Sequence, residues 1–221
     1  MRLILVGCEY AGKTTLANEI VKWIDKTLGG ARGFHDHFTI PSNELTVEDQ
    51  DQFAALSPRL KEMFQRYIIE YHLQPAFYAD PDHNMTGFHI EEAVYAPLYY
   101  GYGGKGEYAE RTTLARAVEK TIMEEAPDTV LILLTASAEV IAQRMRENPQ
   151  PRGVLQEKDI EYVLQRFEEE YQSSLIRRKF ILDTTTATVE ETLAEFAEQI
   201  ELYLSDADRL RMLAHQALHA K

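Results

Sequence analysis

The most constraining feature of the sequence is the segment G-C-E-Y-A-G-K-T at residues 7–14, which matches the pattern G-x-x-x-x-G-K-[ST] without a mismatch. A short β-rich run at residues 2–6 precedes it, and a helical pattern follows over residues 13–28. This order predicts a phosphate-binding loop, in which backbone N–H groups and the positive end of the helix converge on one anion. We therefore expect nucleotide binding at Gly7, Cys8, Glu9, Tyr10, Ala11, Gly12, Lys13, Thr14 and Thr15.

Individual side chains of this loop have separate expected roles. Lys13 is expected to reach the β and γ phosphates, and the Thr14 hydroxyl is expected to complete the shell of a magnesium ion. Glu9 is unusual, because an acid beside polyphosphate is repelled, and we expect its side chain to face solvent. Cys8 is expected to be a packed small residue rather than a reactive thiol.

Composition narrows the class of protein. The chain has 221 residues, 45% of them hydrophobic, which is enough for one sizeable core. A formal net charge of −13 disfavours binding to a nucleic-acid polymer. The single cysteine excludes a disulfide framework and a cysteine-based zinc site. The early apolar run is too short for a signal peptide or a membrane span, so a soluble, cytoplasmic protein without a membrane partner is expected.

Hydrophobic patterns predict strands that alternate with helices. Strands are expected at residues 2–6, 33–38, 86–90, 129–134 and 180–182. Helices are expected at residues 13–28, 58–73, 108–125, from 138, 159–177, 189–204 and 206–221. The alternation predicts an α/β fold, a three-layer sandwich around a mostly parallel five-stranded sheet. We expect a single domain over residues 1–221, with a lid at about 144–157 and a C-terminal helix at about 206–221.

Two of these helices have an apolar stripe in the sequence. In the helix at 58–73 the expected core face holds Leu60, Phe64, Tyr67, Ile68 and Tyr71. In the C-terminal helix, the stripe Leu210, Leu213, Ala214, Ala217 and Leu218 is expected to pack on its own domain, and a homodimer is the alternative.

Other motifs separate the classes of nucleotide-binding protein. The sequence lacks the N-K-x-D and D-x-x-G segments of GTPases, and the apolar run at 129–134 ends in T-A-S rather than in an acid. The segment E-E-A-V-Y-A-P-L-Y-Y-G at residues 91–101 resembles the acid-Arg-x-x-Tyr-Ser pattern of thymidylate kinases and deoxynucleoside kinases. Residues 138–153 and the helix after them are similar to the lid and post-lid helix of those kinases, so with the loop at residues 7–14 the resemblance covers most of the chain and implies a P-loop kinase-like fold.

The resemblance also implies roles for individual residues. Glu91 is implied as the base or the magnesium-organising acid, and Asp183 lies near where such kinases place a loop against adenine. Tyr95 and Tyr99 are implied to line the acceptor site. The lid arginines over the phosphates are implied to be Arg144, Arg146 and Arg152. One departure concerns the arginine that follows the acid in the family and helps to hold phosphate, because this position is Glu92 here.

The residues also leave alternatives open. Asp36 lies in a segment that resembles the Asp-containing segment of uridine and nicotinamide-riboside kinases, and it competes with Glu91 as the key acid. Arg111 could reach an acceptor phosphate from the next helix.

The leading hypothesis is an ATP- and Mg²⁺-dependent phosphotransferase for a small-molecule acceptor, preferably a nucleoside or nucleoside monophosphate. The alternatives are a kinase of a sugar, vitamin or antibiotic, and a nucleotide-binding switch without transfer activity.

Overall fold

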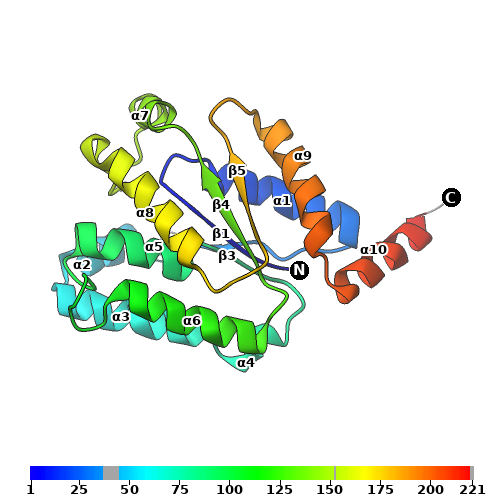
Figure 1. Cartoon of the computed structure of the whole chain (residues 1–221), viewed down its shortest axis with the longest axis horizontal. Helices are drawn as coiled ribbons and strands as arrows, with labels where there is room; N and C mark the ends of the chain where they lie inside the picture. The colour runs from blue at the N-terminus through cyan, green and yellow to red at the C-terminus, as the bar shows by residue number, and fades with distance from the viewer. Residues whose placement is uncertain (37–44, 152, 220–221) are drawn as a thin grey trace.

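The computed structural model describes residues 1–36, 45–151 and 153–219. Its centre is a five-stranded sheet with the strand order β2-β3-β1-β4-β5, in which every neighbouring pair is parallel (Figure 1). The strands are β1 (Arg2–Gly7), β2 (His35–Asp36), β3 (His83–Thr86), β4 (Val130–Thr135) and β5 (Lys179–Asp183). β1 and β4 are apolar and almost wholly buried, as expected of central strands with both faces covered. The predicted five-stranded, parallel sheet is confirmed.

Helices cover both faces of the sheet and form the predicted three layers (Figure 1). On one side, α1 (Lys13–Leu28) contacts β1, and α9 (Val189–Ile200) contacts β5. On the other side, α5 (Phe88–Tyr95) and α8 (Ile160–Ser173) contact β1, and α6 (Arg111–Glu125) packs on α5. The remaining helices are α2 (Val47–Ala55), α3 (Pro58–His72), α4 (Pro75–Tyr78), α7 (Ala138–Glu147) and α10 (Asp206–His219). A π-helical turn over Ala96–Tyr100 extends α5, and short 3₁₀ turns lie at Glu157–Asp159 and Glu201–Tyr203.

The predicted strand at residues 86–90 is wrong, because β3 ends at Thr86 and helix α5 begins at Phe88. Gly87 and Phe88 both have positive φ, 76° and 52°, and this sharp turn reverses the chain from strand to helix. All eight residues of α5 are buried, so the helix has no solvent-exposed face and its sequence lacks the amphipathic period of a surface helix. Of the predicted strand at 33–38 the structure describes β2 at His35–Asp36, and residues 37 and 38 lie outside the described residues.

The apolar stripe predicted for α3 faces outward rather than toward the core. Leu60, Phe64, Tyr67 and Tyr71 are between 42% and 62% exposed, whereas the buried residues of the helix are Glu62, Gln65, Ile69 and His72. The prediction failed because a polar side chain of α3 has a buried partner: the carboxylate of Glu62 forms an ion pair with the buried Arg111.

The stripe predicted for α10 is also exposed. The helix packs on α1 as expected, but through its other face. Arg211 forms an ion pair with Asp82 at 2.7 Å and donates a hydrogen bond to the carbonyl of Gly30 at 2.8 Å, and Met212 packs against the core. In the described part of the chain, no helix is long and apolar enough to cross a membrane.

His83 in β3 makes stability depend on pH. Burial, followed by the nearby His72, lowers the pKa of His83 from 6.5 to about 4. Between these pH values the unfolded chain binds a proton that the folded chain does not, so the free energy of unfolding decreases as pH falls. We expect a loss on the order of 2 kcal/mol between pH 6.5 and 4 from this residue, measured by urea unfolding. His83→Asn should flatten this slope and the exposed His219→Asn should keep it; an unchanged slope in His83→Asn would contradict the assignment.

Candidate active site

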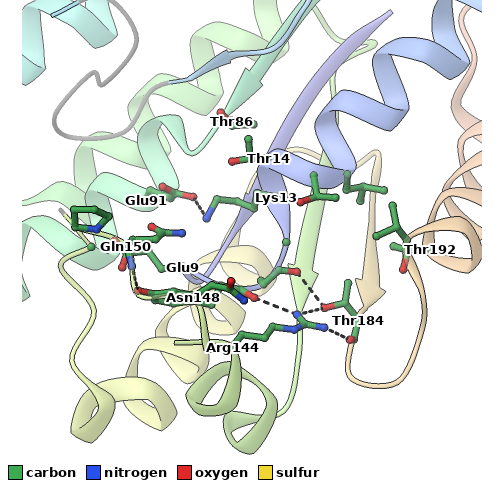
Figure 2. A pocket seen from close by; sticks show the side chains of 18 of the residues that line it. Glu9, Lys13, Thr14, Thr86, Glu91, Arg144, Asn148, Gln150, Thr184 and Thr192 are labelled. Carbon is green, nitrogen blue, oxygen red and sulfur yellow. Dashed lines mark hydrogen bonds and ion pairs between the residues drawn. The ribbon is translucent and has the colours of Figure 1, made fainter. Parts of the chain in front are cut away.

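A large cavity lies at the carboxyl ends of the parallel strands, where β1, β3 and β5 stop and the loops to the next helices begin (Figure 2). Open α/β sheets bind ligands at this edge. The cavity has a volume of about 1200 Å³. Its lining residues are Glu9, Tyr10, Ala11, Gly12, Lys13, Thr14, Thr15, Leu16, Val47, Gln50, Thr86, Glu91, Arg144, Asn148, Gln150, Pro151, Gly153, Thr184, Ala187, Val189 and Thr192.

The loop between β1 and α1 has the backbone of an anion cradle. Gly7 packs so closely on β4 that an added Cβ would collide with the carbonyl oxygen of Leu134. Tyr10 and Gly12 have positive φ, 66° and 98°, and Gly12 is the N-cap from which α1 starts. Gly12, Thr14 and Thr15 line the cavity at the positive end of this helix. The geometry is therefore suited to binding a polyphosphate.

Lys13 connects this cradle to an acid on a neighbouring element. Its ammonium donates hydrogen bonds to the carbonyl of Gly7 at 2.6 Å and to that of Cys8 at 3.2 Å. It also forms an ion pair with Glu91 Oε1 at 3.0 Å (Figure 2). Burial alone would lower the pKa of Lys13, but the adjacent Glu91 carboxylate keeps that pKa above its usual value. The lysine therefore stays charged beside the cradle.

Glu91 owes its position to the turn before α5. The residue lies in the first turn of the helix, is 2% exposed and lines the cavity. A Cβ added at Gly87 would lie 2.7 Å from Glu91 Oε2, so the turn needs a glycine to leave room for the carboxylate. The predicted location of Glu91 at a strand end is wrong, but the structure still brings it to the carboxyl edge of the sheet.

Tyr95 and Tyr99 do not line the cavity. The hydroxyl of Tyr95 accepts a hydrogen bond from the backbone N–H of Glu9 at 2.9 Å, and the side chain is completely buried. Burial raises the pKa of Tyr95 well above its usual value. The hydroxyl of Tyr99 donates to Asp159 at 3.1 Å and accepts from the backbone of Gln156 at 3.3 Å. Both tyrosines contact backbone segments next to the cavity, and neither is among its described lining residues.

Glu9 is buried rather than solvent-facing, which corrects a second expectation. Its two carboxylate oxygens accept hydrogen bonds from the backbone N–H groups of Val154 and Leu155, both at 3.1 Å. The neighbouring Tyr10 hydroxyl accepts from the backbone of Gln150 at 3.1 Å. Burial raises the pKa of Glu9, and the two backbone hydrogen bonds oppose that rise. Two side chains of the phosphate-binding loop thus attach the connection between α7 and α8 to the cradle.

Removing the Glu9 carboxylate should loosen this connection. We expect Glu9→Ala to leave two backbone N–H groups without their acceptor, and hydrogen exchange at residues 153–155 should accelerate by about tenfold or more. Hydrogen–deuterium exchange read by mass spectrometry measures this. Glu168→Ala, at an exposed acid of α8, is the matched control. Unchanged exchange in Glu9→Ala would show that the carboxylate does not hold the connection.

The three predicted lid arginines have different positions. Arg144, in the last turn of α7, lines the cavity and donates to the Tyr10 carbonyl at 3.1 Å and to the Thr184 carbonyl at 2.7 Å (Figure 2). Arg146 instead forms an exposed ion pair with Glu157 and is not among the lining residues. Arg152 lies outside the described residues.

The loop after β5 contributes a wall that the sequence did not reveal. Asp183 does not line the cavity, and its carboxylate accepts hydrogen bonds from the backbone and the hydroxyl of Thr185. The lining residues from this part of the chain are Thr184, Ala187, Val189 and Thr192. Small and β-branched side chains have no distinctive chemistry in a sequence. Thr184 and Ala187 follow β5 in the loop, which is a signal that could have identified them, whereas Val189 and Thr192 belong to α9.

Val47, Gln50 and Thr86 also line the cavity, and none of them was predicted. Thr86 is the last residue of β3, and Val47 and Gln50 belong to α2. The backbone of Asp36 pairs with Thr86 in the sheet, and its side chain lies outside the described part of the structure.

Cys8 is buried as predicted, and burial raises the pKa of its thiol to about 12, so it is an inert packed residue.

Arg111 is not available to an acceptor phosphate. Its guanidinium is 2% exposed and donates hydrogen bonds to Glu92 Oε2 at 3.0 Å and to the Glu62 carbonyl at 3.1 Å. Glu62 Oε1 lies 3.4 Å from the guanidinium, which also stacks over the Tyr102 ring at 5.0 Å. The predicted acceptor contact is therefore corrected: Arg111 is the cation of a buried ion-pair network (Glu62, Glu92, Tyr102 and Arg111).

No family model and no curated protein matches the chain. Solved structures match it over nearly its whole length, so the chain shares its fold with several kinases. Deoxyadenosine kinase from M. mycoides with bound dATP is 16% identical, covers 91% of this chain and 100% of its own, and has a TM-score of 0.60. Thymidylate kinase from Candida albicans is 14% identical, with 91% of each chain covered and a TM-score of 0.59. Shikimate kinase from Bacteroides thetaiotaomicron is 15% identical, with coverages of 91% and 98% and a TM-score of 0.53.

Proposed function

We propose that this protein transfers the γ-phosphoryl group of ATP, as its magnesium complex, to a hydroxyl group of a small acceptor of the nucleoside class. The observation that carries the proposal is the Lys13–Glu91 pair. A cationic side chain of the phosphate cradle lies 3.0 Å from a buried carboxylate inside one cavity. The cavity volume of about 1200 Å³ exceeds the usual range for a single small ligand, so it has room for a donor and an acceptor together.

The donor is assigned to the cradle side. The loop backbone and the start of α1 would hold the triphosphate, with Lys13 on the β and γ phosphates. Arg144 faces the same space from α7 and would balance charge on the transferring group. The wall after β5, which includes Ala187 and Thr192, would contact the base.

The residues present also suit magnesium. The Thr14 hydroxyl and the Glu91 carboxylate both line the cavity, and oxygen donors of this kind are the ligands that Mg²⁺ prefers. A bound Mg²⁺ would neutralise charge on the phosphates. Within the described ranges no group of three or more His, Cys, Asp and Glu side chains could hold a metal ion. This agrees with a site in which phosphates and water supply most of the ligands.

Glu91 is assigned to the acceptor. Its carboxylate would orient the acceptor hydroxyl and take its proton while the new oxygen–phosphorus bond forms and the bond to the leaving ADP breaks. Lys13, which lies 3.0 Å from Glu91, would also contact the phosphates and so link the carboxylate to the transferring group. Asp36 is the alternative acid. Deoxyadenosine kinase and thymidylate kinase among the similar structures support an acceptor of the nucleoside class, and shikimate kinase keeps other hydroxyl compounds open.

The test is a coupled assay of ADP release with Mg²⁺ and a panel of nucleosides, nucleoside monophosphates, sugars and vitamins. We expect one acceptor class to stimulate ADP release strongly, and acceptor-independent ATP hydrolysis would instead favour a nucleotide switch.

With the accepted compound, Glu91→Gln should lower kcat by about 100- to 10,000-fold while ATP affinity stays near the wild-type value. Asp36→Asn is the matched variant, since it removes the competing acid. If Glu91→Gln turns over normally and Asp36→Asn does not, the role belongs to Asp36.

A further inference from the structure

We infer that α3 forms the interface of a homodimer, in which two copies of this chain pack their α3 helices against each other in antiparallel orientation. The surface concerned lies outside the cavity lining, so the inference goes beyond the proposed function and does not depend on it. It follows from an exposed aromatic stripe on α3 and from the charges on the two sides of that stripe.

The α3 stripe consists of Leu60, Phe64, Tyr67 and Tyr71, each of which is between 42% and 62% exposed. Its members are spaced four, three and four residues apart, which is the spacing of the contact line between two packed helices. Met63, also exposed, widens the apolar surface on one side. Contiguous exposed apolar surface marks interaction sites, and Tyr, Phe and Met are enriched in protein interfaces.

Neighbouring elements hold the α3 stripe in place. The ring of Phe64 contacts Phe53 of α2 edge-on at 4.9 Å, and the ring of Tyr71 contacts Phe77 of α4 in the same way at 4.9 Å. On the opposite face of the helix, Glu62 belongs to the buried ion-pair network, so α3 cannot turn its stripe inward without breaking an ion pair. A surface that is already ordered loses little conformational entropy on binding.

The exposed stripe of α10 is a second candidate surface, and its composition is less suited to an interface. Its large members are the leucines Leu210, Leu213 and Leu218. Residues that contribute most of the binding energy at interfaces are enriched in Tyr, Trp and Arg, whereas Leu is under-represented among them. The α3 stripe, with two tyrosines and a phenylalanine, is therefore the better interface.

The charges beside the α3 stripe favour a second copy of the chain and set its orientation. With about 3.6 residues per turn, Arg59 and Glu70 lie on the same side of the stripe near opposite ends of the helix, and Lys61 lies on the other side. In an antiparallel pair the same sides of the two helices meet, which brings Arg59 next to Glu70 of the partner subunit. In a parallel pair opposite sides meet, and Arg59 would face Lys61 of the partner subunit. Opposite charges thus support the antiparallel pair, and like charges disfavour the parallel one.

The first experiment is sedimentation velocity of the wild-type protein over a range of concentrations. An interface centred on one pair of helices is small, so we expect a dissociation constant on the order of 10 µM. At about 100 µM most of the protein should then sediment with twice the chain mass of 25.4 kDa. Protein that stays monomeric at this concentration would overturn the inference.

The second experiment locates the interface. Tyr67→Glu places a charge in the middle of the α3 stripe, and we expect it to raise the dissociation constant by about 100-fold or more. Leu213→Glu is the matched control, because it places the same charge on the exposed stripe of α10 and should leave the dimer as in the wild type. Circular dichroism checks that both variants are folded. Wild-type association of folded Tyr67→Glu, or loss of the dimer in Leu213→Glu, would overturn the assignment to α3.

The third experiment tests the orientation with exposed residues whose replacement leaves the core unchanged. Arg59→Glu and Glu70→Arg should each weaken the dimer by about tenfold, because each brings like charges together twice across the two-fold axis. The double variant exchanges the two charges and should return the dissociation constant to within about threefold of the wild-type value. A double variant as weak as the single variants would overturn the antiparallel arrangement.

Discussion

Replacing Lys13 with methionine is expected to lower kcat by about 100- to 1000-fold and to weaken ATP binding sharply, while the fold is retained. Methionine keeps the length of the side chain but removes the charge that lies 2.6 Å from the Gly7 carbonyl and 3.0 Å from Glu91. The loss affects the phosphates directly, because Lys13 is the cationic residue of the cradle itself. Steady-state kinetics and calorimetric titration with ATP measure the two effects.

Lys22→Met is the matched control for this change. Lys22 lies on α1 as well, but it is 71% exposed and pairs with Glu19 on the surface. It should bind ATP and turn over as the wild-type protein does. A folded Lys13→Met variant with undiminished ATP affinity would contradict the assignment of the cradle.

Replacing Arg111 with methionine is expected to lower the free energy of unfolding by about 3 to 5 kcal/mol. The substitution removes the guanidinium that the buried carboxylates of Glu62 and Glu92 share, so that Glu62 keeps its ion pair with Arg66 at 3.2 Å whereas Glu92 loses its arginine partner. The cost comes from the carboxylates that remain rather than from the ion pair itself. Urea unfolding followed by circular dichroism measures the change.

Two further variants test this explanation of the Arg111 effect. Arg177→Met, at an exposed arginine, should change stability by less than about 1 kcal/mol. Adding Glu92→Gln to Arg111→Met should recover part of the loss, because one of the two buried charges is then removed. A loss in Arg111→Met no larger than that in Arg177→Met would mean that the network is not energetically important.

The sequence by itself determined the features that arise from neighbouring residues. The cradle is such a feature, because its backbone N–H groups, its lysine and its helix start all lie within residues 7–15 and act through local geometry. The strand–helix alternation and the parallel sheet were also predictable, since central strands β1 and β4 are continuous apolar runs. The helix α1 was predicted with its correct bounds because Gly12 and Gly29 mark its two ends.

Only the tertiary structure decided how residues far apart in the chain meet. Glu91 was expected at a strand end, but burial on all sides hid the helical period of α5. Glu9 binds backbone groups 145 and 146 residues away, and Arg111 pairs with Glu62, 49 residues earlier. Charged side chains look alike in a sequence whether they face solvent, a ligand or another buried charge. Their role depends on how far folding removes them from water and on which partners it brings within hydrogen-bonding distance. Neither can be read from the neighbouring residues in the sequence.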